Sequence, residues 1–451
     1  MKRKVVMYGI VLALALMLPA CAKSTNTTAD AQTGVVNTPV NASNVLVISS
    51  TNAFVDTYGT YRVVGMVTNN SSNAITSIEL TVGIQDASGN SLLKDDSGNI
   101  TPGTTISTVL YTLAPGEASP FEYSYDTTNG IPSAYTVSIT GQQTGTANRA
   151  TLHSENVQFV DDGSGWFYLT GELVNTGSQW AHINALAGAV SDDSGNVLSA
   201  DWTATYATEL APAGDASGRD RTPFEINFPN PGGSTKWSLY WDADVTDSVT
   251  DYPVQLELTN GYFDQYGSFH VVGWVTNQSG QSLTSLVVAG LYATDKKVVD
   301  ASYGFVPVPM KPGVQAPFNI SSFGSVDYNP GQASLVTAYS GQLDPWSTYP
   351  PSNASVDLAA EGEVVLKDGG TWTINGNVTN TSGRDLSGIT VVVTVLNAEN
   401  RLVAMEYTSI SPSGDAIAAG EMNPYSVTVL LDPNVDASGF TTSTVVVGDV
   451  K

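Results

Sequence analysis

The segment 59–69, GTYRVVGMVTN, contains the pattern that decides the fold. Tyr61, Val63 and Val67 alternate with other residues and share one side of the segment with Gly65. Such alternation is typical of a β-strand with one buried face, because successive side chains point to opposite sides. Glycine weakens a strand, so we expect Gly65 to make room for a large side chain from the facing sheet, or to mark a bulge.

The same spacing of glycine, glycine and asparagine returns three more times. The later copies read GWFYLTGELVN at 165–175, GSFHVVGWVTN at 267–277 and GTWTINGNVTN at 370–380. Their closing asparagines are separated by 106, 102 and 103 residues. A period of about 100 exceeds that of solenoid repeats and equals one β-sandwich domain.

The two faces of the repeated strand differ in composition. The face with Tyr61, Phe167, Phe269 and Trp372 is apolar in all four copies and is expected to be buried. The opposite face is mixed to polar, as Val64 of the first copy and Asn375 of the last illustrate, and we expect it to be solvated.

Each copy continues with further strand and turn signals. A second alternating segment follows the asparagine, and in the first two copies it ends in an Asp-Ser-Gly-Asn type turn at 86–90 and 192–196. A Pro-aromatic pair comes later in every copy: Pro120-Phe121, Pro223-Phe224, Pro317-Phe318 and Pro424-Tyr425. Many short strands without helices predict an all-β protein made of four tandem antiparallel β-sandwich domains.

These motifs resemble the FxLYD-type domain of bacterial envelope lipoproteins, a family similar to immunoglobulin-like folds. The resemblance extends over four stretches between about 45 and 451 and implies Ig-like, extracytoplasmic modules without catalytic residues. The expected domains are 45–150, 151–252, 253–357 and 358–451.

The first residues predict export and anchoring. Three basic residues precede an apolar run from Val5 to Leu18, which is too short for a spanning helix but suits a secretory signal. Leu18-Pro-Ala-Cys21 resembles a lipobox, which implies a signal peptide at 1–20 and a lipid on Cys21. Cleavage after Ala22 and an uncleaved anchor are the alternatives. The polar segment 21–44 is expected to be a flexible tether.

Composition excludes several functions. With 17 Lys+Arg against 42 Asp+Glu, the net charge of −25 argues against nucleic-acid binding. One cysteine and three histidines leave little for transition metals, and no nucleophile, phosphate-loop or zinc-protease motif occurs. We therefore expect no catalytic residues and no cofactor. Weak Ca²⁺ binding at acidic turns is the alternative to plain turns around Asp86, Asp95, Asp161 and Asp192.

Five of the eight tryptophans fall in the second copy. A recognition surface for glycans would use its aromatic residues, and the alternative is packing under the insertion at 212–223 or against the next domain. The residues in question are Trp166, Tyr168, Trp202, Trp237 and Trp241.

The sequence thus favours a non-catalytic lipoprotein of the bacterial cell envelope, facing outside the cytoplasm. Its tandem sandwiches are expected to form a semi-rigid rod that acts as a spacer, adhesin or scaffold through protein or glycan partners, with the membrane reached through the lipid. Glycan or substrate binding by the second domain is the main alternative, and a hydrolase with paired carboxylates is the remote one.

Overall fold

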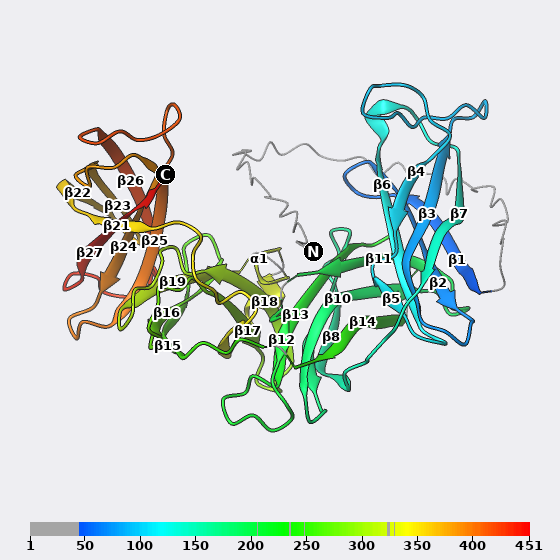
Figure 1. Ribbon diagram of the computed structural model, residues 1–451, viewed down its shortest axis with the longest axis horizontal. Helices are drawn as coiled ribbons and strands as arrows, with labels where there is room; N and C mark the ends of the chain where they lie inside the picture. Colours follow the sequence, from blue (N-terminus) through cyan, green and yellow to red (C-terminus); the bar gives the residue numbers. More distant parts are fainter. Residues whose placement is uncertain (1–44, 205, 234–235, 248, 323–324, 329) are drawn as a thin grey trace. The chain divides into compact units, whose positions relative to one another are not determined.

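The computed structural model describes residues 45–451 except 205, 234, 235, 248, 323, 324 and 329. The predicted signal peptide, Cys21 and the tether lie outside these residues. The described chain is all-β, as predicted, and its antiparallel sheets pack as sandwiches (Figure 1). No helix in this part of the chain has the length and apolar character needed to cross a membrane.

The described strands form eight sheets, and each sheet takes its strands from one stretch of sequence. We call the four resulting pairs of sheets the first to fourth modules. In every module, one sheet contains the repeated strand in its middle and is called the N-terminal sheet; the other is called the C-terminal sheet.

In the first module, β1-β2-β6 form the N-terminal sheet, and β3 pairs with β4, β5 and β7 in the C-terminal sheet. The elements are β1 (Leu46–Val55), β2 (Thr60–Asn69), β3 (Ile75–Gln85), β4 (Thr104–Ser107), β5 (Thr112–Leu113), β6 (Ala118–Asp126), the 3-10 helix η1 (Thr127–Asn129) and β7 (Ala134–Thr144).

The second module repeats this order with β8-β9-β13 in one sheet and β10 pairing with β11, β12 and β14 in the other. Its strands are β8 (Leu152–Asp161), β9 (Trp166–Asn175), β10 (Trp180–Ser191), β11 (Val197–Thr203), β12 (Glu209–Leu210), β13 (Arg221–Pro229) and β14 (Lys236–Thr246).

The third module has sheets β15-β16-β19 and β18-β17-β20. Its elements are β15 (Val254–Phe263), β16 (Phe269–Asn277), β17 (Leu286–Tyr292), β18 (Val298–Phe305), β19 (Gln315–Ser321), two short helices α1 (Ser325–Tyr328) and α2 (Pro330–Ala333), and β20 (Ala338–Leu343).

The fourth module has sheets β22-β23-β26 and β21-β27-β24-β25. Its strands are β21 (Ser355–Leu358), β22 (Ala360–Asp368), β23 (Thr371–Thr379), β24 (Leu386–Leu396), β25 (Leu402–Ile410), β26 (Met422–Leu430) and β27 (Thr441–Val450). The expected boundary at 357/358 falls inside β21, which pairs with β27 and so belongs to the fourth module.

The repeated strand contributes the same core residues in every module. Tyr61, Phe167, Phe269 and Trp372 are all buried, and so are the aliphatic residues two and six positions further on. The alternation therefore identified the buried face in all four modules. Burial of such side chains stabilises a fold by about 1.5–3 kcal/mol each.

The central glycine of the motif faces an aromatic ring. A Cβ on Gly65 would lie 2.4 Å from the ring of Phe121, and the register pairs these two residues across β2 and β6. Gly171 with Phe224, Gly273 with Phe318, and Gly376 with Tyr425 repeat the pair. The ring comes from the neighbouring strand of the same sheet, not from the facing sheet as expected. A bulge in the first strand of each module adds to the crowding.

The closing asparagine of the motif is buried, and its side chain hydrogen-bonds to several backbone groups. The Asn69 amide donates to the carbonyl oxygens of Asn73 and Leu113, each at 2.8 Å, and its Oδ1 accepts from the Ser71 backbone at 2.9 Å. Asn175, Asn277 and Asn380 make the equivalent bonds. The side chain thereby satisfies backbone groups where the strand ends, which explains why the spacing ends on asparagine.

Candidate functional site

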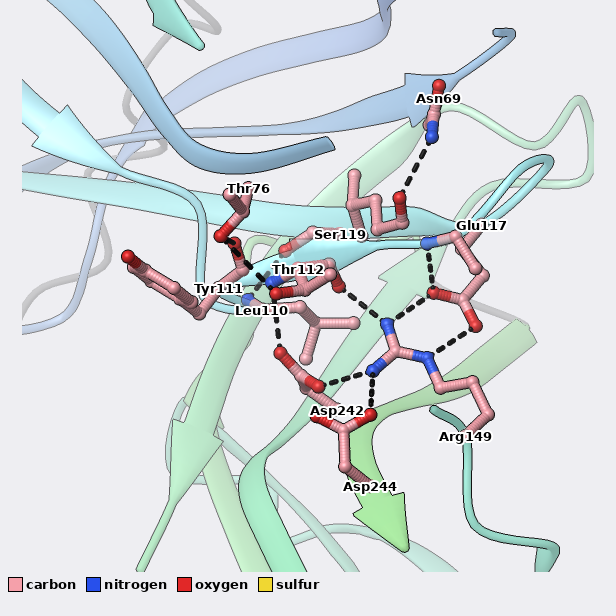
Figure 2. Close-up of polar contacts among 12 residues, drawn as sticks. Asn69, Thr76, Leu110, Tyr111, Thr112, Glu117, Ser119, Arg149, Asp242 and Asp244 are labelled. Carbon is pink, nitrogen blue, oxygen red and sulfur yellow. Dashed lines mark hydrogen bonds and ion pairs between the residues drawn. The ribbon is translucent and has the colours of Figure 1, made fainter. Parts of the chain in front are cut away.

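The clearest polar cluster lies where the first module meets the second, and Arg149 is its centre (Figure 2). The guanidinium donates to Glu117 of the first module through Nε at 3.0 Å and Nη2 at 2.6 Å, and Nη2 also donates to the Thr112 carbonyl at 2.7 Å. Nη1 donates to Asp242 and Asp244 of β14 in the second module. Arg149 therefore ties together groups from two modules.

The cluster is shielded from water, so its charged groups need partners inside the protein. The Arg149 side chain is 20% exposed and that of Asp242 is 1% exposed. The second Asp242 oxygen accepts from the Thr112 backbone at 2.9 Å, so both of its oxygens have partners. Burial alone would lower the pKa of Arg149, but hydrogen bonding to Glu117 and the charge of Asp242 raise it. All five bonds that a guanidinium can donate are used inside the protein, so the cluster joins modules and does not offer an anion site.

The next contacts between modules follow one plan. A side chain on the outer face of an N-terminal sheet donates to a backbone carbonyl on the edge strand of the next module. Asn52 donates to Leu198 at 3.1 Å, Thr170 to Val298 at 2.5 Å, and Asn260 to Val403 at 3.0 Å. The receiving strands are β11, β18 and β25, which occupy the same place in their sheets. We call these three contact regions the joints.

The joints bury the outer faces that we expected to be solvated. Val64 and Met66 pack with Ala189, Val197 and Ala200 of the second module. Thr170 and Val272 are buried in the second and third modules, and only in the fourth is the equivalent Asn375 partly exposed. The expectation was therefore wrong for three modules, because it took each module alone and left out the neighbour that covers it.

Carboxyl groups lie in two of the joints, where Asp300 is buried and Asp201 is partly buried. Burial, together with the charge of Glu122, raises the pKa of Asp201 to about 7. Burial also raises the pKa of Asp300 to about 7, while a hydrogen bond with Glu225 opposes the rise. Glu122 and Glu225 each follow the aromatic residue that faces the motif glycine, so both joints place a carboxyl at the same position.

A recess of about 560 Å³ opens beside the first joint. Glu122 and Ser124 line it from the first module, and Asn184, Asp201 and Trp202 from the second. The Trp202 side chain is 57% exposed. The recess thus places one exposed aromatic ring beside polar groups from two modules.

The other aromatic residues predicted for a recognition surface have different surroundings. Trp237 is 40% exposed, whereas Tyr168 is buried and cannot offer an exposed ring. Trp166 is partly buried, with its ring centroid 5.8 Å from that of Tyr58, and Trp241 packs against the second module's core. Of the five residues, Trp202 is the one that the structure places in the recess.

The acidic turns use their own carboxylates. Asp86 Oδ1 accepts from the Ser88 and Asn90 backbones at 2.8 and 2.9 Å, and Asp95 and Asp192 repeat this pattern. The hydrogen bond from the Asn90 backbone is the main cause that lowers the pKa of Asp86. Within the described residues, no group of three or more acidic, His or Cys side chains is arranged to hold a metal.

The histidines have structural partners. His270 lies between Asp264 at 3.2 Å and Asn319 at 3.2 Å, and its ring stacks on Tyr262 with centroids 5.0 Å apart. His182 contacts Glu209 at 3.0 Å. Arg149 and Asp242 were not predicted as a pair, since 93 residues separate them and neither lies in a motif.

Comparison with known proteins identifies no family. No protein-family model matches the chain, and no curated protein matches it. Among solved structures, red sea bream transglutaminase is 13% identical, with 40% of this chain and 27% of that chain covered at a TM-score of 0.16. Elastase-activated Escherichia coli alpha-2-macroglobulin is 10% identical, with 89% and 44% covered at a TM-score of 0.12. This chain spans less than half the length of each, and such values assign it no activity or partner.

Proposed function

We propose that this protein is a lipid-anchored scaffold or spacer of the bacterial cell envelope, built from sandwich modules with fixed joints. The observation that carries the proposal is the Arg149 network, in which a partly buried arginine and the buried Asp242 hold two modules together. A flexible linker would need no such network, because ordering these side chains costs conformational entropy.

The repeated plan of the joints supports the same function. All three use the outer face of one N-terminal sheet and an edge strand of the next module, and all three include a side-chain bond to a backbone carbonyl. Covering the edge strand also protects it from pairing with other chains, which suits a protein exposed outside the cell. The charge of −25 favours solubility and repels anionic polymers.

Anchoring rests on the first residues. The basic head, the apolar run and Cys21 support export followed by lipid attachment at the only cysteine of the chain. Labelling of cells with a radioactive fatty acid should mark the protein, and Cys21→Ser should abolish the label and release the protein from the membrane fraction. Persistent labelling of this variant would contradict the anchor.

Limited digestion tests the fixed joint. Trypsin cleaves after arginine and lysine in exposed extended segments, so a flexible linker would be cut at Arg149. We expect the bond after Arg149 to survive under conditions that cleave after Lys94, which is exposed. Cleavage at both sites at similar rates would contradict the proposal.

A further inference from the structure

We propose that the recess beside the first joint binds a neutral oligosaccharide, with one sugar ring stacked on Trp202. This goes beyond the scaffold function, which requires no ligand. The recess draws its walls from two modules, so it exists only where the joint holds them together.

Trp202 supplies the exposed aromatic ring of the recess. Indole is a large apolar surface that proteins usually bury, and 57% of this side chain is exposed inside a recess. The register places Trp202 opposite Ala187, between strands β11 and β10. A flat ring fixed on a sheet is a platform for the apolar C–H face of a sugar, and it loses little entropy on binding.

Polar groups line the recess around that ring. Glu122 is held by Arg62 and by the Ser124 hydroxyl, the latter at 2.9 Å. Asn184 donates to Asp242 at 3.3 Å, and Asp201 accepts from the Trp202 backbone at 2.8 Å. The bonds to Glu122 use Oε1 and the bond to Asp201 uses Oδ1, while Asn184 donates through its amide nitrogen to Asp242 and Asp244. Each side chain is thus oriented by these bonds and has another oxygen atom that can accept from a hydroxyl group.

The charges around the recess favour a neutral ligand. Arg62 forms ion pairs with both Glu122 and Asp56, and burial favours the protonated form of Asp201. The single positive charge of Arg62 faces two carboxylates, so the recess offers hydrogen-bonding groups with a net negative charge. This charge and the net charge of −25 both repel acidic sugars and phosphates. Neutral polyhydroxylated rings satisfy both conditions.

Binding can be measured with the full chain by tryptophan fluorescence and calorimetry. The probes are maltohexaose, cellohexaose and the hexamer of N-acetylglucosamine, followed by an array of neutral oligosaccharides. We expect at least one to bind, and Trp202→Ala to weaken its affinity at least tenfold. Trp237→Ala is the matched control, since Trp237 is also exposed, and should change affinity less than twofold.

The possible results separate clearly. Tighter binding of acidic sugars than of neutral ones, absence of binding to every neutral saccharide, or equal effects of the two alanine variants would overturn the proposal. Unchanged thermal melting of both variants excludes misfolding as the cause of a lost affinity. Resistance to trypsin at Arg149 is independent of any sugar, so failure here leaves the scaffold function to its own test.

Discussion

The outer faces of the N-terminal sheets differ between the first and fourth modules, because a following module covers only the first. Val64 of the first module is buried against the second, whereas Asn375 occupies the equivalent position of the fourth and is partly exposed. Pro120 is buried and its counterpart Pro424 is exposed. Both sheets have the same order of strands and bury the equivalent face of the repeated strand, but only the first is covered by a following module.

The open face of the fourth module is not purely polar. Val364 and Leu366 are 54% and 57% exposed on β22, beside Thr373 and Asn375 of β23. Threonine and asparagine replace the large side chains found on covered faces, which lowers the cost of exposure. The side chains on this outer face therefore differ between the first and fourth modules, while the core face of the repeated strand is apolar in all four.

The largest expected effect comes from placing a charge on the two faces. Val64→Asp should destabilise the first module by about 4 kcal/mol, because the joint buries the carboxylate without a partner. Asn375→Asp should change stability by less than about 0.5 kcal/mol, since water reaches it. Urea unfolding measures both, and equal losses would show that the two faces do not differ in cover.

Removal of the Arg149 side chain should have the next effect. Arg149→Met leaves Asp242 charged, buried and without its cation, which should cost about 3 kcal/mol. Lys297→Met breaks an exposed pair with Asp295 and should cost at most about 1 kcal/mol. If Arg149→Met were as mild as its control, the network would not hold the joint.

Acid titration should distinguish joints from the open face. The pKa of Asp300 is about 7 in the folded chain, against 3.8 for an ordinary aspartate. Between these two pH values, Asp300 therefore binds more protons in the folded state than in the unfolded state. Stability from this group is therefore present at low pH and is lost as pH rises from about 4 to 7. Asp300→Asn should weaken the dependence of melting temperature on pH over this range, and Asn375→Ala should leave it unaltered. An unchanged slope for Asp300→Asn would contradict the assignment.

The smallest effect is expected from apolar residues of the open face. Leu366→Thr should alter the free energy of unfolding by less than about 0.5 kcal/mol, because the side chain is already mostly in water. Val272→Thr, on the covered face of the third module, should cost about 1–2 kcal/mol, because it buries a hydroxyl. Thermal melts of both variants make the comparison, and a larger loss for Leu366→Thr would mean that the face is covered.

The features that recur in all four modules could be predicted from the sequence. Alternation around Gly65 and its three copies identified the strand and its buried face, because burial within one module depends on local pattern. The partner of Gly65 could have been inferred from Pro120-Phe121, since the Pro-aromatic pair recurs in phase with the glycine. The spacing does not show, however, whether the aromatic ring lies on a neighbouring strand of the same sheet or on the facing sheet.

The joints and the recess could not be predicted in the same way. Arg149 meets Asp242 through a contact between modules, and no periodicity connects positions so far apart. Trp202 looked like any other tryptophan of the second module until the structure placed Glu122 of the first module beside the same recess. Sites formed by two modules depend on how the modules pack against each other, and the pattern repeated within each module does not show this.

The distance distribution across the first joint tests the fixed geometry most directly. Spin labels at Thr105 and Ser238, both exposed and in different modules, would report it by pulsed electron resonance, with Cys21 replaced by serine. We predict a single narrow distribution that broadens in Arg149→Met. A distribution in the unaltered joint as broad as that of Arg149→Met would contradict the account.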